Sequence, residues 1–273
     1  MQTRTENSWR FIDSGSANAA FNMAADVVLA KTAQRWPVLR VYRWQPYAIS
    51  VGYNQRPEEI DLAKCQKDGI EVVKRPTGGR AIFHAHELTY CVVIPKQSPL
   101  FANNSIELYN KISLALVSGL RQIGLPVDLQ SRIHSDPAFA NYNHKFACFA
   151  TSAKYEIQWQ AQKLVGSAQR RFDSAVLQHG SILLGNDHLK IFEYLSSNNN
   201  GEALKHREQL RKKTVCIETI LKQKVRYESL VPKLRWGFEK YFCVNLVEKP
   251  LNSDEQKQIE LMKSNFIDFR RKP

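Results

Sequence analysis

The stretch KLVGSAQRRFDSAVLQHGSILL, residues 163–184, decides the fold. It contains two β-like runs, Lys163–Arg171 and Val176–Leu184, separated by the turn signal Asp173-Ser174, and this pattern predicts a pair of antiparallel strands. A third β-like run, Tyr155–Gln160, precedes them and is separated from Lys163 by the short turn Ala161-Gln162. We therefore expect a three-stranded β-meander in this part of the chain.

Helices and strands alternate through the residues that precede the meander. Hydrophobic periodicity and turn signals predict helices over 18–34, 58–68 and 105–123, and strands near 9–12, 38–44, 47–53 and within 70–94. From residue 187 the pattern is helical and charged, and a last helix begins near Ser253 with Gln256 as its capping partner. The predicted fold class is α+β, with mixed, largely antiparallel sheets flanked by helices and with C-terminal helices.

The chain divides into two predicted parts. Residues 9–185 are expected to form one core, and residues 186–273 a C-terminal helical extension packed on it. Within the core, residues 132–154 form a long stretch of mixed composition without a clear period. A loop of that length inside a compact domain is often functional.

The composition is that of a globular protein. The chain has 273 residues and a net charge of +13, with 43% apolar and 24% charged residues. It has neither a run of 18 apolar residues nor an apolar N-terminal segment, so we expect no membrane span and no signal peptide. Five cysteines without a CxxC pair argue against disulfides or a metal site and favour the cytoplasm. The diffuse positive charge favours a large acidic partner.

The loop Arg75-Pro76-Thr77-Gly78-Gly79-Arg80 is the first candidate for a binding site. Consecutive glycines let backbone N–H groups approach a ligand closely, and the flanking arginines suit an anionic or strongly polar group. An ordinary glycine turn is the alternative, and the loop alone slightly favours it. The loop matches neither a Walker sequence nor GxGxxG.

The strand Lys163–Gln169 is the second candidate. In a regular strand Gly166 and Ala168 leave one face open for close contact, for example with an acyl chain. Lys163 and Ser167 then lie on the other face. The commoner alternative is a strand that merely begins with an exposed lysine.

The strand Leu177–Ser181 is the third candidate, because His179 and Gly180 interrupt its apolar pattern. A histidine in such a strand is usually a hydrogen-bonded structural residue. The seven histidines of the chain show no spacing typical of a zinc site.

Cys148 is the cysteine best placed for chemistry. Most cysteines are small buried hydrophobes, and this interpretation is favoured for Cys65, Cys91, Cys216 and Cys243 because they lie in strand-like or helix-like segments. Cys148 instead ends the irregular stretch just before the meander, where a thiol can be exposed and activated.

Together, these segments resemble the lipoate/biotin protein ligase superfamily. Within it they are most similar to the cysteine-dependent octanoyltransferases that resemble lipoate-protein ligase A. The resemblance spans roughly residues 9–185 and rests on an ordered set of motifs: Trp9–Gly15, Phe21–Ala24, Ser50–Tyr53, Arg75–Arg80, Glu87–Tyr90, Cys148-Phe149, Tyr155-Glu156, Gly166–Arg170 and Leu177–Ser181.

The resemblance implies a catalytic core that moves an octanoyl group from acyl carrier protein to a lysine of a lipoyl-carrier protein (a lipoyl domain or a glycine cleavage H protein), in lipoate biosynthesis. Cys148 would match the family's thioester nucleophile, and Lys163 the lysine that assists it. The acyl pocket and its walls would contain Arg75, Gly78, Gly79, His84, Gly166, Ser167, Ala168, His179 and Gly180. We expect a monomer that has no nucleic-acid partner.

The implied roles agree with elementary thiol chemistry. A free thiol has a pKa of about 8.5, so little thiolate exists at neutral pH, and a nearby ammonium stabilises that form. Attack on the donor exchanges one thioester for another, and the acceptor amine then makes an amide, so neither ATP nor another cofactor is needed. Carrier proteins are commonly acidic, which suits a basic enzyme.

Three positions depart from the family pattern. Ala85 stands where the family often has an acidic residue, which weakens a role for His84. Ser152-Ala153 replaces a Pro-Ser pair that is common in the family shortly after the nucleophile. Arg80 replaces a third glycine typical of adenylate-forming ligases, and this departure favours the transferase.

Three other functions stay open at the level of sequence. One is an ATP-dependent lipoate or octanoate ligase, which shares the Gly-Gly loop and the Gly166-Ser167-Ala168 motif. Another is an amidotransferase that moves octanoate between lipoyl-carrier proteins. The last is a basic nucleic-acid-binding protein, which no recognisable module supports.

Overall fold

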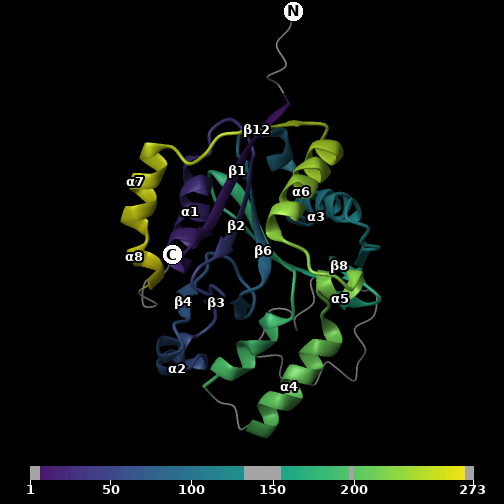
Figure 1. Ribbon diagram of the computed structural model, residues 1–273. Coiled ribbons are helices and arrows are strands. Elements are labelled where there is room, and N and C mark those ends of the chain that lie inside the picture. The colour runs from purple at the N-terminus through teal and green to yellow at the C-terminus, as the bar shows by residue number, and fades with distance from the viewer. Residues whose placement is uncertain (1–6, 132–154, 197–199, 268–273) are drawn as a thin grey trace, which may run out of the picture.

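A mixed six-stranded sheet forms the centre of the protein, as seen in a computed structural model that describes residues 7–131, 155–196 and 200–267 (Figure 1). In spatial order the strands are β10 (Val165–Arg171), β11 (Ala175–Leu183), β6 (Glu87–Pro95), β2 (Val38–Trp44), β1 (Ser8–Ala17) and β12 (Asn245–Glu248). The pairs β10–β11, β11–β6 and β6–β2 are antiparallel, whereas β2–β1 and β1–β12 are parallel. The predicted α+β class with largely antiparallel sheets is confirmed.

Two smaller sheets flank the main one. They contain β4 (Glu71–Lys74), β3 (Ala48–Val51) and β5 (Ile82–His84), and β7 (Asp128–Ser131), β8 (Tyr155–Trp159) and β9 (Gln162–Lys163). The prediction of one continuous meander was therefore wrong. Lys163 pairs with β8, but the chain breaks at Leu164 and then joins the main sheet, because the Leu164 N–H donates to the Ile157 carbonyl instead of continuing a strand.

Helices cover both faces of the main sheet (Figure 1). The helix α1 (Ala19–Thr32) lies on one face with α7 (Ser253–Met262) and α8 (Ser264–Ile267), and α3 (Ser105–Arg121) and α6 (Tyr227–Phe242) cover the other. The remaining helices are α2 (Leu62–Lys67), α4 (Asn200–Lys213) and α5 (Ile217–Leu221), with short 3-10 turns at Pro57–Glu59, Pro99–Ala102 and Asp187–Tyr194. No helix among these described residues is long and apolar enough to cross a membrane.

Side-chain oxygens at the helix starts explain where several helices begin. Asn18 and Asn104 accept the Phe21 and Glu107 N–H groups at the starts of α1 and α3. The last long helix carries a capping box between Asn252 and Glu255. The partners predicted for this last helix, Ser253 and Gln256, are therefore one residue too far along the chain.

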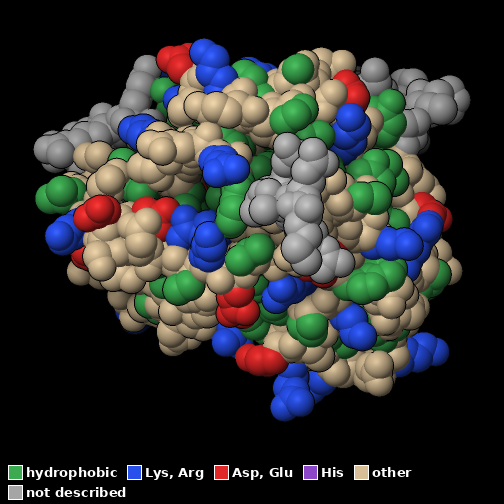
Figure 2. Space-filling view, turned by 90° about the horizontal axis from the view of Figure 1, so that it is seen from above, with side chains coloured by type: hydrophobic (Ala, Val, Ile, Leu, Met, Phe, Trp, Pro, Cys, Tyr) green, Lys and Arg blue, Asp and Glu red, His purple; other side chains and the backbone are tan. Residues whose placement is uncertain are grey.

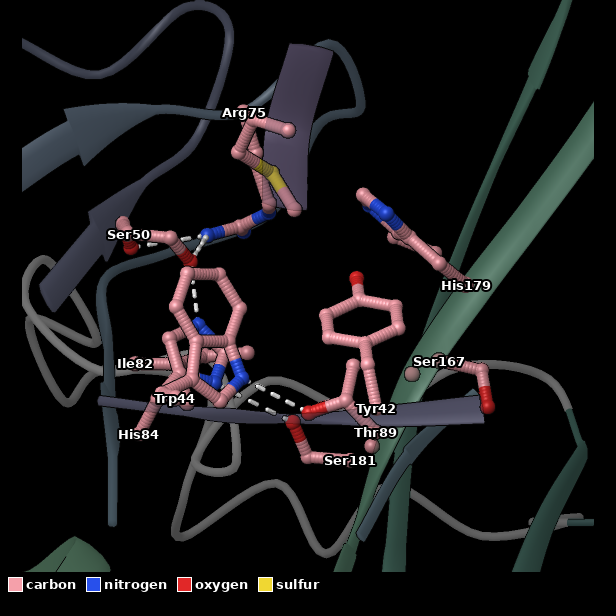
Figure 3. A pocket seen from close by; sticks show the side chains of 14 residues that line it. Tyr42, Trp44, Ser50, Arg75, Ile82, His84, Thr89, Ser167, His179 and Ser181 are labelled. Atoms are coloured by element: carbon pink, nitrogen blue, oxygen red, sulfur yellow. Dashed lines mark hydrogen bonds between the residues drawn. The ribbon is translucent and has the colours of Figure 1, made fainter. Parts of the chain in front are cut away.

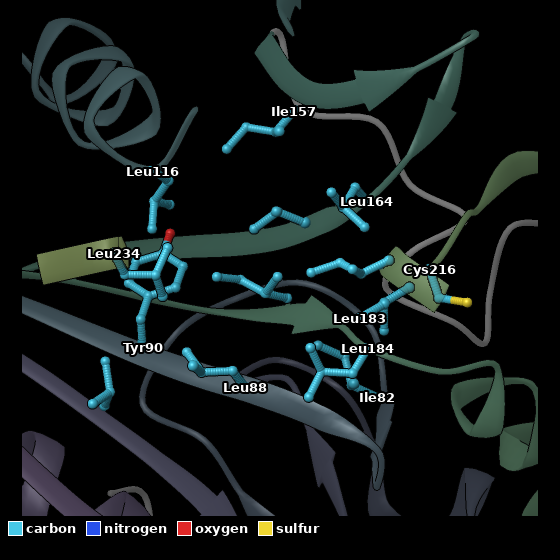
Figure 4. Packing of buried hydrophobic residues seen from close by; sticks show 14 of the residues in the cluster. Ile82, Leu88, Tyr90, Leu116, Ile157, Leu164, Leu183, Leu184, Cys216 and Leu234 are labelled. Carbon is cyan, nitrogen blue, oxygen red and sulfur yellow. The ribbon is translucent and has the colours of Figure 1, made fainter. Parts of the chain in front are cut away.

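The strand β6 is buried on both faces, which sets the place of the site. Its Leu88, Tyr90, Val92 and Ile94 side chains pack into the larger core beneath α3 and α6, where Figure 4 shows Leu88 and Tyr90 among their neighbours. Glu87, Thr89 and Cys91 alternate with them and point to the face that α1 covers. This second face is unusually polar for a buried surface, because β2 and β11 add charged and hydroxyl side chains to it.

The C-terminal residues contribute one strand as well as helices. β12 pairs in parallel with β1, with Trp9 opposite Leu246, so the prediction of helices alone missed an edge strand of the main sheet. The run Asn245–Glu248 is too short to show a period of two clearly. The division of the chain at residue 185 stays a prediction.

His188 should make the stability of the fold sensitive to mild acid. It is buried, with Nε2 2.9 Å from Thr214 Oγ1, and burial lowers the pKa of His188 to about 4. Because the unfolded chain binds this proton more readily, stability present above pH 6.5 is lost as the pH falls toward 4, by about 3 kcal/mol. Urea unfolding at several pH values checks this: His188→Gln should flatten the decline, and parallel curves would contradict the assignment.

Candidate active site

A narrow cavity of about 20 Å³ lies on the α1 face of the main sheet (Figure 3). Its walls come from α1, the three strands β2, β6 and β11 of the main sheet, the neighbouring β10 and the small sheet of β3 and β5. The lining residues are Met23, Tyr42, Trp44, Ser50, Arg75, Ile82, His84, Thr89, Gly166, Ser167, Ala168, His179, Gly180 and Ser181.

The structure brings together most of the predicted pocket residues. Those that line the cavity are Arg75, His84, Gly166, Ser167, Ala168, His179 and Gly180. Gly78 and Gly79 do not line it, and neither does Lys163. Cys148 lies outside the described residues, so its position relative to the cavity stays a prediction.

Arg75 fixes the glycine loop against the cavity. Its guanidinium donates to the carbonyl oxygens of Ser50, Gly78 and Arg80 at 2.9, 2.8 and 2.7 Å. The arginine thus holds the shape of its own loop, and Gly78 and Gly79 contribute by folding around it. Gly79 has a φ of +96°, a conformation that favours glycine.

Gly52 should resist substitution because it lies under this loop. A Cβ at Gly52 would sit 1.9 Å from the Gly79 carbonyl oxygen, which is backbone and cannot rotate away. We expect Gly52→Ala to lower the free energy of unfolding by about 1–3 kcal/mol. Urea unfolding measures this, and Gly201→Ala, where a Cβ meets nothing within 4 Å, is the matched control. Equal stability of the two variants would contradict the close packing.

The opposite wall is built from backbone. β10 pairs with β11 so that Gly166 faces Ser181 and Ser167 faces Gly180. A Cβ at Gly180 would lie 2.4 Å from the Gly166 carbonyl oxygen, so glycine is required where the two strands meet at the cavity. The Ser167 hydroxyl lies 2.7 Å from the Tyr90 hydroxyl. Gly166 and Ala168 thus leave a smooth surface against which an apolar chain can pack.

A buried ion network supports the back of the cavity. Asp26 is fully buried and accepts hydrogen bonds from Arg40 Nη1 at 2.7 Å and from the Tyr42 hydroxyl at 2.9 Å, and His179 Nδ1 lies 2.9 Å from the same carboxylate. Burial works to raise the pKa of Asp26, but the hydrogen bond from His179 and the charge of Arg40 outweigh it and hold this pKa below its ordinary value.

The protonation of His179 follows from this network. Burial lowers the pKa of His179, so its imidazole is neutral near pH 7. The ionised Asp26 can only accept, so His179 Nδ1 carries the proton and donates it. His179 Nε2 then accepts from the Thr77 hydroxyl, 2.7 Å away. The histidine predicted to be a hydrogen-bonded structural residue is one, and it also lines the cavity.

Asp26→Asn should strongly destabilise the protein. Arg40 has no exposed surface, and the substitution leaves its guanidinium buried without the carboxylate that balances it. We expect the free energy of unfolding to fall by about 3–5 kcal/mol. Urea unfolding measures the loss. The double variant Asp26→Asn/Arg40→Met should lose less than the sum of the single variants, and strict additivity would contradict a paired network.

His84 is held between two elements at the other end of the cavity. Its Nε2 lies 2.7 Å from Ser50 Oγ and its Nδ1 lies 2.8 Å from Glu87 Oε1. The Trp44 ring stacks on it with centroids 4.0 Å apart and an interplanar angle of 11°. The Trp44 indole N–H donates to Thr89 Oγ1 at 2.7 Å. Figure 3 shows Ser50, Trp44 and His84 grouped at one end of the cavity.

Lys163 lies outside the cavity, in a buried ion pair. Its Nζ is 2.8 Å from Glu156 Oε1, and both side chains are at most 5% exposed. Glu156 Oε2 also accepts from the Gln158 side chain at 3.1 Å. The alternative of a strand that begins with an exposed lysine is therefore wrong, because Lys163 is buried and a carboxylate holds its ammonium.

The described cysteines separate into buried and exposed thiols. Burial raises the pKa of Cys65 to about 11 and the pKa of Cys91 well above its ordinary value, so neither forms a thiolate readily. Cys216 is also buried. Cys243 is exposed, so the core interpretation was wrong for it, because it follows the last turn of α6 in a left-handed conformation.

Sequence reasoning missed half of the residues that line the cavity. These are Met23, Tyr42, Trp44, Ser50, Ile82, Thr89 and Ser181. Most of them lay inside segments recognised as strands or helices, so they were assigned to the core. The available signal was the presence of Asp26, Arg40 and Glu87 within apolar segments, since charged residues are rarely buried without a partner.

The match to a family model decides the relationship. Residues 18–239 match the lipoyl protein ligase A/B catalytic domain. The chain belongs to this family. Sequence similarity extends over almost the full length: octanoyltransferases LipM of Clostridioides difficile and Anoxybacillus flavithermus are 36% and 33% identical, over 93% and 94% of both chains. The LipM of Bacillus subtilis is 32% identical over 92% of both chains.

Solved structures of this family share the fold. A bi-partite lipoate protein ligase of Thermoplasma acidophilum superposes with a TM-score of 0.76 at 21% identity, over 94% of this chain and 92% of the other. A lipoate-protein ligase A bound with ATP gives a TM-score of 0.73 at 21% identity, over 94% of both chains. The family resemblance and the fold predicted from sequence are confirmed.

Proposed function

We propose that this member of the lipoyl protein ligase A/B family is an octanoyltransferase of lipoate biosynthesis. The observation that carries the proposal is the similarity to curated octanoyltransferases over 92–94% of both chains. The cavity supports it, since backbone of β10 and β11 lines one side and Met23, Trp44 and Ile82 supply apolar surface. Its donor is octanoyl-acyl carrier protein, and its acceptor is a lysine of a lipoyl-carrier protein.

The proposed reaction has two steps on one sulfur. The Cys148 thiolate attacks the carbonyl carbon of the donor thioester, a C–S bond to Cys148 forms, and the carrier thiol leaves. The acceptor amine then attacks the carbonyl carbon of the new thioester. A C–N bond forms, the C–S bond to Cys148 breaks, and the free Cys148 side chain is regenerated. The ammonium of Lys163, held by Glu156 at 2.8 Å, is proposed to stabilise negative charge on this sulfur.

The ATP-dependent ligase is the alternative that the curated relatives do not favour, because those cited above are octanoyltransferases. An amidotransferase between lipoyl-carrier proteins shares the thiol chemistry. It differs only in its donor, so a comparison of donors separates it from the proposed enzyme.

The surface charge is consistent with acidic carrier proteins. The net charge is +13, and Figure 2 shows Lys and Arg side chains spread over one end of the molecule with Asp and Glu between them. A field of this kind speeds the encounter with an acidic partner without defining where it docks. A monomer in the cytoplasm is part of the proposal.

Octanoyl transfer with and without ATP tests the function. We expect the purified protein to transfer octanoate from octanoyl-acyl carrier protein to an unmodified lipoyl domain without ATP. Mass spectrometry of the enzyme with the donor alone should show an octanoyl adduct on Cys148 that hydroxylamine removes. Transfer that requires free octanoate and ATP, with release of pyrophosphate, would instead identify a ligase.

A further inference from the structure

A second cavity lies behind the wall that Trp44 and His84 build. It is a groove of about 650 Å³ between the end of β2, residues 85–87 and the segment 224–228 that leads into α6. Trp44 lines both this groove and the first cavity, and Glu87 lies in the groove wall. The two spaces are therefore neighbours across a single layer of side chains.

Three buried polar atoms in the groove wall lack a hydrogen-bond partner among the described residues. They are Arg43 Nε, Glu87 Oε2 and Glu218 Oε1. His86 Nε2 is 3.9 Å from Glu218 Oε1, which is too far for a hydrogen bond. Since buried polar groups are nearly always paired with protein or water, these atoms mark places in the groove wall where a ligand can form hydrogen bonds.

The two carboxylates favour a ligand with positive charge. Glu87 is 2% exposed, and its Oε1 accepts from Thr89 and Ser181 at 2.6 and 2.7 Å as well as contacting His84. Within the described ranges no lysine or arginine forms an ion pair with it. A primary ammonium carries three donors and no acceptor, so it suits two carboxylate oxygens that lack partners.

The rim of the groove carries the opposite charge. Arg43, Lys224 and Arg226 line it, and Arg43 Nη1 is 3.1 Å from Glu228. The cations of the rim would not attract the ammonium of a flexible small molecule. An ammonium that projects from an acidic protein surface is attracted twice, because the ammonium pairs with Glu87 and the surrounding acidic groups pair with the basic rim.

The groove also lies at the end of the sheet where Lys163 stands. Leu183 pairs with Glu87, and its N–H donates to the carbonyl oxygen of Leu164, the residue after Lys163. On the groove side, the Glu218 N–H donates to the Leu184 carbonyl oxygen at 3.1 Å. Lys163 and the groove therefore lie near the same end of the β6–β11 pair, where β6 begins and β11 ends.

We propose that this groove receives the acceptor lysine, that Glu87 and Glu218 bind its ammonium, and that Glu87, hydrogen-bonded to His84, takes its proton. The inference rests on the proposed octanoyl transfer, for which it supplies the acceptor site. Glu87 is then a catalytic residue, and His84 positions its carboxylate from the cavity side.

The proton balance of the second step requires such a base. The acceptor arrives as an ammonium with three protons and leaves as an amide with one. Glu87 removes the first proton, and the amine nitrogen then attacks the octanoyl carbonyl carbon. The C–N bond forms, the C–S bond breaks with its electron pair on sulfur, and the nitrogen gives its second proton to the departing sulfur. The products are the amide, the Cys148 thiol and protonated Glu87.

The two half-reactions test the groove separately. The enzyme is first acylated with octanoyl-acyl carrier protein and freed of donor, and the loss of its thioester is then timed with an unmodified lipoyl domain or with hydroxylamine. Hydroxylamine is uncharged near pH 7 and needs no ammonium site. The variants are Glu87→Gln and Glu218→Gln, and Glu260→Gln on α7, which is exposed and paired with Lys263, is the matched control.

We expect all variants to form the thioester and to react with hydroxylamine at the normal rate. Transfer to the lipoyl domain should fall about 100-fold or more in Glu87→Gln and about tenfold in Glu218→Gln, and stay unchanged in Glu260→Gln. Normal transfer in both groove variants would overturn the inference, and so would an equal loss of both reactions in Glu87→Gln. Failure of the unsubstituted enzyme to form the thioester would instead contradict the proposed function.

Discussion

Octanoyl transfer should fall by at least about 10⁴-fold when Cys148 is replaced by alanine, because alanine offers no atom that can carry the acyl group. The octanoyl adduct on the enzyme should disappear with it. Binding of the donor and the free energy of unfolding should change little, since only the sulfur is lost. Intact-protein mass spectrometry and a transfer assay measure both effects on one preparation.

Cys243 provides the matched control for this substitution. It is an exposed free thiol that follows the last turn of α6. Cys243→Ala should keep both the adduct and full transfer. An active Cys148→Ala enzyme, or an adduct that moves to Cys243, would overturn the thioester mechanism.

Lys163→Met should abolish most activity and also destabilise the fold. The substitution removes the ammonium that balances the buried Glu156 carboxylate, 2.8 Å away. Breaking a buried pair on one side costs about 3–5 kcal/mol. If this ammonium also stabilises the Cys148 thiolate, the pH at which the enzyme acylates should rise as well. Urea unfolding and the pH dependence of acylation measure the two effects.

The double variant Lys163→Met/Glu156→Gln separates stability from chemistry. Removing both charges restores much of the lost free energy of unfolding, because no charge is left buried alone. Acylation should stay slow, since the ammonium is still absent. A double variant that regains both stability and activity would show that Lys163 serves only to balance Glu156.

The sequence predicts the elements well where local signals are strong. Apolar residues at helical spacing predicted the long helix now seen as α3, and alternation predicted β6. It failed where a contact between distant residues decides the structure. Lys163 was assigned to one strand with Arg171, yet its carbonyl oxygen accepts the Val215 N–H and the chain changes sheet at Leu164.

The site shows the same division. The glycine loop, Gly166–Ala168 and His179 were recognisable because glycine and histidine stand out in apolar strands. Gly166–Ala168 and His179 line the cavity, and Arg75 is the one loop residue that does. Glu87 was interpreted as the polar side of an alternating strand. In the structure that side is buried, so the same pattern produces a carboxylate with almost no exposed surface.

Local signals in the sequence predicted most of the helices and strands, because periodicity and turn residues act between near neighbours in the chain, and the ordered motifs indicated the family by resemblance. Only the tertiary structure decided which charges meet. Asp26 with Arg40 and His179, Lys163 with Glu156, and Glu87 with His84 lie on different elements or across a turn. Their proximity follows from how sheets and helices pack, and burial then makes each pairing obligatory.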